Sequence, residues 1–154
     1  MQEVILSTGA DQIDHYVLQT DQEKTGYYVD GEFESFGNIP DTFFVAGEEP
    51  IVEDRLTSRY GPVFIEGANV TSLRWVAHDP SSSIIALWDM GHAKSYAAFK
   101  NALRSWDSPM QNILFVNRED TVAIRSSGYL PLRTGETALG ILDGSSSENG
   151  WIGR

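Results

Sequence analysis

The dipeptide Asp30-Gly31 lies between two short runs of β-forming residues, 27–29 and 32–33. A two-residue type I′ turn needs positive φ at both central positions, and an Asp-Gly pair meets that requirement better than most pairs do. Segment 25–36, TGYYVDGEFESF, therefore predicts a tight antiparallel hairpin. This turn commits the first part of the chain to β structure.

Turn residues divide the chain up to residue 78 into further short segments with strand character. Gly47 and Pro50 mark one such turn. In the last segment, SLRWVAH, apolar and polar residues alternate, which is typical of a half-buried strand. The predicted strands are 13–18, two or three within 41–64, and 72–78.

The periodicity changes between residues 82 and 106, where turn residues become rare. The apolar residues of one helical face are Tyr96, Phe99, Leu103 and Trp106. This spacing predicts one long helix that ends before Pro109. Segments NILFV and TVAIRS then predict a second hairpin over residues 117–120.

The order of strands, one long helix and strands indicates an α+β fold made mostly of antiparallel strands. No internal repeat or linker divides the chain, and 154 residues can form a real core. We therefore expect residues 1–154 to be a single domain, or a fragment of a larger one.

The charge of the chain excludes some partners. Eleven basic and 22 acidic side chains give a net charge of −11, and residues 1–60 carry 13 of the acids with only 3 basic residues. Such a chain is a poor ligand for nucleic-acid phosphates. No apolar run is long enough to span a membrane, so no membrane partner is expected. The absence of cysteine excludes disulfides and thiolate metal sites.

The motifs of common catalytic sites are missing. There is no Gly-x-Ser-x-Gly elbow, no phosphate-binding Gly-rich loop and no EF-hand, and no organic cofactor is expected. Asp11 and Asp14, with the carbonyl of Ile13, offer three oxygens to a hard cation such as Ca²⁺, but two acids at this spacing are common by chance and are more typical of turns and caps. Trp75 on a strand suits either an apolar ligand pocket or the core.

The order of several motifs resembles the β-subunit of the penicillin acylase (penicillin amidase) family of N-terminal-nucleophile (Ntn) amidohydrolases. The segments that carry the resemblance are STGADQIDHYV, KTGYYVDGEFESF, SRYGPVF, SLRWVAH, the run from YAAFKNALRSW to GYLPLR, and DGSSSENGWIGR. Tyr60 stands where the family usually has His, and NREDT lacks the usual glycine.

The resemblance implies that the chain is the middle part of an αββα-type Ntn β-subunit. The parent would be a hydrolase that cleaves the amide of β-lactam antibiotics or N-acyl compounds. In that family the nucleophile is the first residue of the β-subunit, and its own amine is the base. That residue would lie upstream of Met1, so residues 1–154 alone are expected to be inactive.

The resemblance also implies roles for six residues. Asp11, the carbonyl of Ile13 and Asp14 match calcium ligands. Gly9 matches a backbone donor to the oxyanion. Trp75 and Gln111 match positions that line the acyl-side pocket.

Two functional hypotheses follow. The first is an acylase segment whose partners are the α-subunit, the remainder of the β-subunit and a small amide substrate; by resemblance it would act in the periplasm or outside the cell. The second is a stand-alone β-rich binding or interaction module, with or without dependence on calcium. A segment separated from its parent exposes apolar surface, so self-association is expected.

Overall fold

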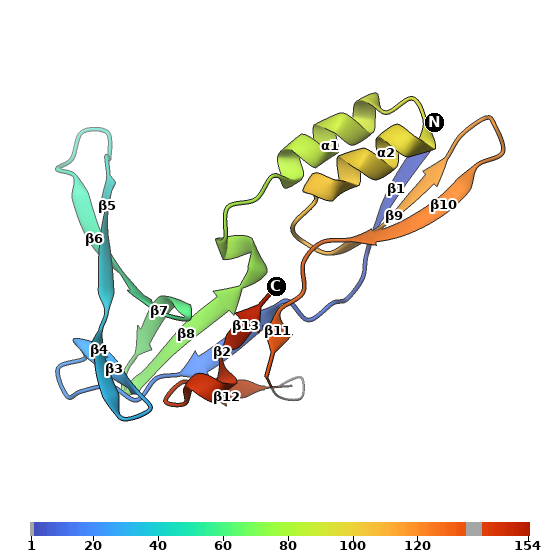
Figure 1. Cartoon of the computed structure of the whole chain (residues 1–154). Helices are drawn as coiled ribbons and strands as arrows, with labels where there is room; N and C mark the ends of the chain where they lie inside the picture. Colours follow the sequence, from blue (N-terminus) through green and yellow to red (C-terminus); the bar gives the residue numbers. More distant parts are fainter. Residues whose placement is uncertain (1, 135–139) are drawn as a thin grey trace. The chain divides into compact units, whose positions relative to one another are not determined.

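The computed structural model describes residues 2–134 and 140–154, and the chain divides into two compact units (Figure 1). Unit 1 consists of residues 2–12, 76–131 and 154. Unit 2 consists of residues 13–75, 132–134 and 140–153. The chain therefore leaves unit 1 after residue 12 and returns to it at residue 76.

Unit 1 is a three-stranded antiparallel sheet with helices on one face. Its strands have the order β1 (Gln2–Ser7), β9 (Gln111–Val116) and β10 (Val122–Ser127). Ile113 and Phe115 of the central strand are fully buried against Phe99 and Met90 of the helices. The helices therefore cover the face of the sheet that carries alternate residues of β9.

The prediction of one long helix is wrong, because the segment forms two short helices. These are α1 (Ser83–His92) and α2 (Tyr96–Ala102). Ala93 between them has extended backbone (φ −68, ψ 123), and the Ser95 side chain accepts a bond from the N–H of Ala98, as an N-cap does. Leu103 continues into a 3₁₀ turn, η2 (Leu103–Ser105), so the apolar stripe crosses a change of helix type. No described helix is long and apolar enough to cross a bilayer.

The hairpin predicted over residues 117–120 is confirmed, and its turn shows how it forms without glycine. Asn117 Oδ1 accepts hydrogen bonds from the N–H groups of Glu119 and Thr121, both at 3.0 Å. Asp120 takes the positive φ of 57° that glycine would otherwise supply. Asn and Asp are the residues that tolerate such turns best.

Unit 2 is built on a six-stranded sheet with the order β12-β2-β8-β7-β6-β5. All neighbours are antiparallel except β12, which pairs in parallel with β2. Two further antiparallel pairs are β3–β4 and β11–β13. The bounds of these strands are β2 (Ile13–Val17), β3 (Gly26–Val29), β4 (Glu32–Ser35), β5 (Gly37–Phe43), β6 (Ile51–Ser58), β7 (Gly61–Glu66), β8 (Asn69–Trp75), β11 (Leu132–Arg133), β12 (Ile141–Asp143) and β13 (Trp151–Gly153).

The β3–β4 hairpin has the turn that the sequence predicts. Asp30 and Gly31 have φ of 51° and 83°, and Val29 pairs with Glu32 across them. The hairpin carries Tyr27 into the core of unit 2, where it is 1% exposed. The other buried members of that core are Tyr16, Leu18, Val29, Tyr60 and Val70.

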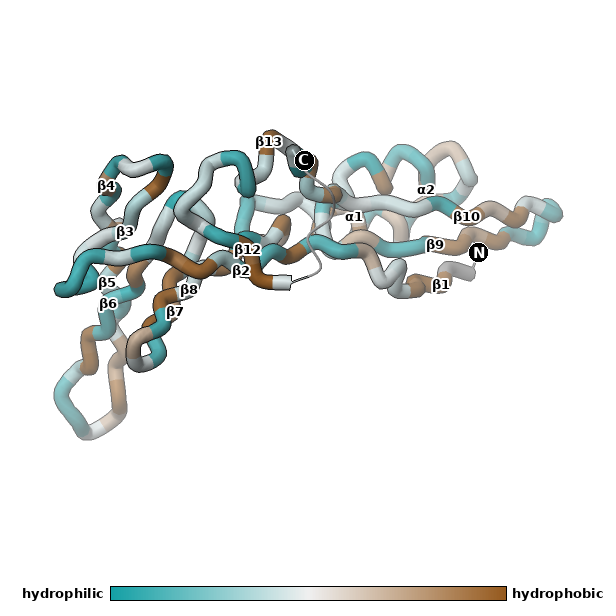
Figure 2. Tube along the Cα trace, turned by 90° about the horizontal axis from the view of Figure 1, so that it is seen from below, coloured by the Kyte–Doolittle hydropathy of each residue, from teal (hydrophilic) through white to brown (hydrophobic). Residues whose placement is uncertain are grey.

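The sheet of unit 1 is apolar on both faces. Val4, Leu114 and Ile124 lie side by side across its three strands, on the face opposite Ile113 and Phe115. Figure 2 shows the hydrophobic colour along β1, β9 and β10. Ile124 is 64% exposed, so the second face has no cover among the described residues of unit 1.

We expect Gly128→Ala to destabilise the protein by about 1–3 kcal/mol. Gly128 has φ +125°, and a Cβ there would lie 2.5 Å from the Met110 Cα. Gly91→Ala is the matched control, because Gly91 lies in α1 with open space at its Cβ position. Since Ala suits a helix better than Gly does, the control should be neutral or stabilising. Urea denaturation followed by circular dichroism measures both, and equal changes would contradict the expectation.

Candidate functional site

Gly9 and Gln111 lie at the same end of the unit 1 sheet. Ser7, the last residue of β1, pairs with Gln111 at the start of β9, and Gly9 follows Ser7 by two residues. Gly9 is exposed with φ +64°. Its N–H donates a long hydrogen bond of 3.3 Å to the Ser7 Oγ. An incoming oxyanion would therefore compete with one weak internal acceptor.

A buried amide, which the sequence analysis missed, holds this loop in place. Gln12 is 8% exposed; its Nε2 donates to the Tyr129 carbonyl at 2.7 Å, and its Oε1 accepts from the Met110 N–H at 3.0 Å. Thr8 Oγ1 donates to the Met110 carbonyl at 3.0 Å. Loop 8–12 is thus fixed to the segment that precedes Gln111. Glutamine is common on surfaces, so nothing in the sequence marks this one as buried.

The other predicted site residues fall into two groups. Ile13, Asp14 and Trp75 belong to unit 2, where Ile13 and Trp75 are register partners in β2 and β8. Asp11 belongs to unit 1 and is exposed. No group of three or more Asp, Glu or His side chains suited to a metal occurs among residues 2–134 and 140–154. The pairing of Trp75 with Gln111 in an acyl pocket stays a prediction.

Asp14 is the most buried charge in the described part of unit 2. Its side chain is fully buried, and its Oδ2 accepts from Arg133 Nε at 2.7 Å and from Trp151 Nε1 at 2.5 Å. Arg74 is its register partner on β8, and the Arg74 guanidinium lies 5.1 Å from the Trp151 ring centre. The second carboxylate oxygen of Asp14, Oδ1, has no hydrogen-bond partner among the described residues. The cluster therefore ties β2, β11 and β13 together and leaves one carboxylate oxygen unused.

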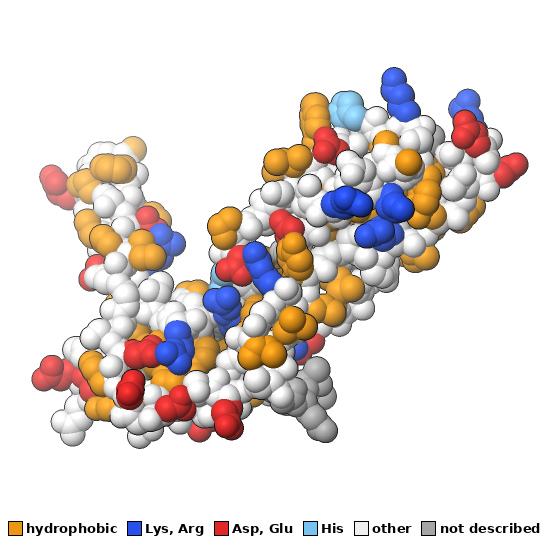
Figure 3. Space-filling view, viewed as in Figure 1, with side chains coloured by type: hydrophobic (Ala, Val, Ile, Leu, Met, Phe, Trp, Pro, Cys, Tyr) orange, Lys and Arg blue, Asp and Glu red, His pale blue; other side chains and the backbone are white. Residues whose placement is uncertain are grey.

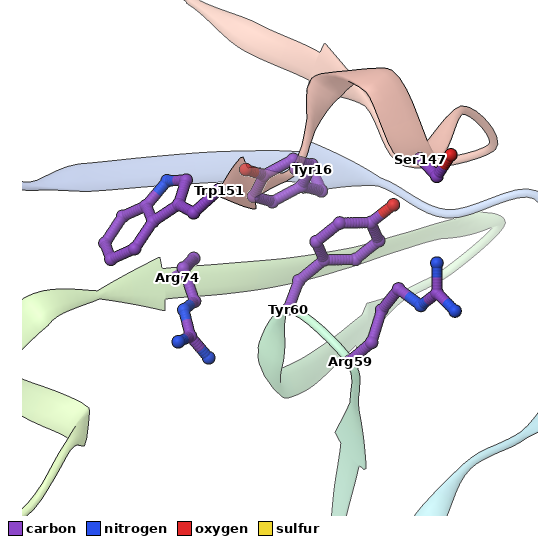
Figure 4. A pocket seen from close by; sticks show the side chains of 7 residues that line it. Tyr16, Arg59, Tyr60, Arg74, Ser147 and Trp151 are labelled. Atoms are coloured by element: carbon purple, nitrogen blue, oxygen red, sulfur yellow. The ribbon is translucent and has the colours of Figure 1, made fainter. Parts of the chain in front are cut away.

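Beside this cluster unit 2 contains a recess of about 210 Å³ (Figure 4). Its lining residues include Tyr16, Arg59, Tyr60, Arg74, Ser147 and Trp151. The rings of Tyr16 and Tyr60 stack with centroids 4.0 Å apart. The recess thus offers flat aromatic faces and two guanidinium groups. Its residues come from four distant segments, so no local pattern in the sequence predicts it.

Buried tyrosine hydroxyls organise the walls of this recess. The hydroxyl of Tyr16 donates to the Asn149 carbonyl at 3.1 Å, and that of Tyr60 donates to the Gly144 carbonyl at 3.0 Å. Burial raises the pKa of both phenols above the ordinary value, and the charge of Asp14 adds to the effect at Tyr16. Both phenols therefore stay protonated near neutral pH and act as fixed hydrogen-bond donors.

Tyr27 connects the recess to the acidic hairpin. Its hydroxyl donates to Glu34 Oε2 at 2.7 Å and accepts from the Arg59 N–H at 2.8 Å. Glu34 also forms an ion pair with the Arg59 side chain. Burial raises the pKa of Tyr27 to about 12, and the hydrogen bond to Glu34 acts in the same direction. Arg59 is thus held at the recess by a carboxylate and a main-chain contact.

We expect Asp14→Asn to destabilise the protein by about 3–5 kcal/mol, because it removes the buried negative charge that pairs with the Arg133 guanidinium. Asp41→Asn is the matched control: Asp41 also pairs through Oδ2 with an arginine Nε, that of Arg55 at 3.1 Å, but both side chains are well exposed. An exposed pair contributes about 0–1 kcal/mol.

Urea denaturation distinguishes the two variants, and the double variant Asp14→Leu/Arg133→Met should recover part of the loss. Equal effects of Asp14→Asn and Asp41→Asn would show that the buried pair does not hold unit 2 together.

Comparison with known proteins gives a match to one protein family. The model of the family described as penicillin amidase matches residues 6–154. No curated protein matches the chain.

Among solved structures, a thermostable penicillin G acylase from Alcaligenes faecalis, in an orthorhombic form, shares the fold. The similarity has a TM-score of 0.82 at 14% sequence identity and covers 98% of this chain. The chain spans 28% of the length of that acylase chain. The family match extends from the Gly9 loop through the Asp14 cluster to the last residue, and on that basis the chain belongs to the penicillin amidase family.

Proposed function

We propose that the chain is part of an N-terminal-nucleophile amidohydrolase that cleaves the amide of β-lactams or N-acyl compounds. The observation that carries this proposal is the family match over residues 6–154. A chain that spans 28% of the related acylase leaves room for further segments that complete the enzyme. The nucleophile and its α-amine base would belong to such a segment.

The architecture of unit 1 supports this proposal. Helices cover one face of the β1-β9-β10 sheet, and the other face presents Val4, Leu114 and Ile124 without cover in the unit. A sheet that is apolar on both faces belongs between two layers. A second sheet from another segment would give the αββα layering that the sequence resemblance implies.

Within this proposal Gly9 contributes a main-chain donor to the oxyanion. A preorganised N–H stabilises the charge that develops on the carbonyl oxygen when the amide is attacked. The Gln12 amide and the Thr8 hydroxyl immobilise the loop that presents this N–H. Gln111, at the same end of the sheet, would face the acyl group, and its amide suits a polar acyl chain better than a purely apolar one.

The test uses a longer polypeptide that carries residues 1–154 behind a segment led by a free Ser, Thr or Cys. We expect it to hydrolyse a chromogenic N-acyl anilide, whereas residues 1–154 alone show no turnover. Gly9→Val should lower kcat of the longer polypeptide by about 10²–10³-fold, because a β-branched residue does not adopt φ +64° and the N–H moves.

Gly9→Asn is the control, since Asn tolerates positive φ and keeps the N–H. Equal kcat values for the two variants, with equal melting temperatures, would remove the oxyanion role. Turnover by residues 1–154 alone that disappears when one of them is substituted would remove the proposal of a missing nucleophile.

We also propose that Asp14 supplies one oxygen to a calcium ion in the longer polypeptide, with the carbonyl of Ile13 and the carboxylate of Asp11 as the resemblance implies. The support is the buried Oδ1 of Asp14, which no described donor satisfies. Arg133 already neutralises the Asp14 charge, and calcium takes six to eight oxygens. The remaining anionic ligands must therefore come from other segments.

Calcium removal tests this site without an activity assay. A chelator should lower the melting temperature of the longer polypeptide, and Asp11→Asn should abolish that response without unfolding the chain, because Asp11 is exposed. A response that is unchanged in Asp11→Asn would exclude Asp11 as a ligand, and no response at all would exclude the calcium site.

A further inference from the structure

Unit 2 contains a two-stranded extension, residues 38–56, that we call the arm. It consists of most of β5, most of β6 and the turn between them. Among the described strands, β6 pairs only with β5 over Ile51–Leu56, because β7 pairs with β6 at Thr57 and Ser58. Figure 1 shows the arm running away from β7 and β8. None of its residues is buried.

The arm is nevertheless rich in large apolar side chains. Six of them are exposed: Ile39, Phe43, Phe44, Val45, Ile51 and Val52. Phe44 is 84% exposed and Val52 62% exposed, and Figure 3 shows hydrophobic side chains gathered at the end of the arm. An isolated hairpin is marginally stable in water, and exposed apolar patches usually mark interaction sites. The arm therefore requires a partner surface.

The charge of the arm selects that partner. Around the apolar end it carries Asp41, Glu48, Glu49, Glu53 and Asp54. Its only basic residue is Arg55, which pairs with Asp41. A second copy of the arm, an anionic membrane surface and a nucleic acid would all be repelled. Lysine or arginine around an apolar face would be attracted.

The edge of the arm limits how the partner binds. β5 is the last strand in the sheet order, so its outer edge has no strand neighbour among the described residues. Pro40 lies in the middle of β5 and has no N–H to donate. Proline on an edge strand opposes the addition of another strand. The partner must therefore contact side chains rather than extend the sheet.

We propose that the arm docks by its apolar end onto an apolar polypeptide face bordered by lysine or arginine. Another segment of the amidase polypeptide would supply that face, since this chain spans 28% of the related acylase. That choice of source depends on the proposed function, whereas the surface chemistry depends only on the arm. The interaction would position unit 2 within the assembled enzyme.

The test measures binding of the chain to a helical peptide of leucine and lysine with one apolar face, by fluorescence anisotropy. The comparison peptide has glutamate in place of lysine. We expect the lysine peptide to bind at least tenfold more tightly than the glutamate peptide. Phe44→Ser/Val52→Thr should weaken that binding at least tenfold. Glu48→Lys/Glu49→Lys takes the arm from a net charge of −4 to 0 and should abolish the preference between the peptides.

The matched control is Val122→Thr, because Val122 is also a valine on a hairpin strand and is 69% exposed. It should leave binding unchanged. Equal binding of the two peptides, an equal loss in the control, stronger binding to anionic vesicles, or a dimer that Phe44→Ser/Val52→Thr abolishes would each overturn the proposal. None of these measurements depends on amide hydrolysis, so a failure here is separate from a failure of the proposed function.

Discussion

The ion pair between Asp14 and Arg133 is the interaction on which unit 2 depends. It joins β2, near the start of the chain, to β11, and the Trp151 indole adds β13 to the same carboxylate oxygen. These contacts bring the last segment of unit 2 against β2, where β12 pairs in parallel and Ser147 and Trp151 complete the recess. A buried charge is costly to desolvate. Removing Asp14, Arg133 or Trp151 is therefore expected to weaken the contacts between the other two.

In unit 1 the neutral side-chain amide of Gln12 joins distant segments, as the Asp14–Arg133 pair does in unit 2. Gln12 satisfies main-chain groups of Met110 and Tyr129 at once, and Gly128 fits beside Met110 only because it has no side chain. Both contacts act on the end of the sheet that holds Gly9 and Gln111. The loop with the proposed oxyanion donor is therefore held by the hydrogen bonds that its own Thr8 and Gln12 side chains make with Met110 and Tyr129.

Local turn chemistry predicted the parts of the fold that depend on neighbouring residues. Asp30-Gly31 and residues 117–120 formed the expected hairpins, because a two-residue requirement on φ acts within a few positions. The prediction of one helix was wrong for two reasons. The apolar stripe begins only at Tyr96, so it carries no signal of the break at Ala93, and it continues past Leu103, where the α-helix changes to a 3₁₀ turn. The division into two units, the Gln12 amide and the recess were not predicted. Each depends on residues far apart in the chain, and no spacing in the sequence encodes such contacts.

Gln12 also bears on the order in which the chain folds. Its main-chain carbonyl accepts from the Val76 N–H at 3.3 Å, and its side chain holds Tyr129. Once unit 1 has formed, residues 12, 76 and 129 are already close to one another, and they lie at or near three of the four points at which the chain passes between the units. Residues 76–131 separate the two parts of unit 2 in the sequence, but once folded they no longer act as a long flexible loop between them. The entropy cost of bringing these two parts together is then smaller. If unit 1 forms first, residues 132–153 therefore begin the search for the partners of β12 and β13 from a point that is already close to the start of β2.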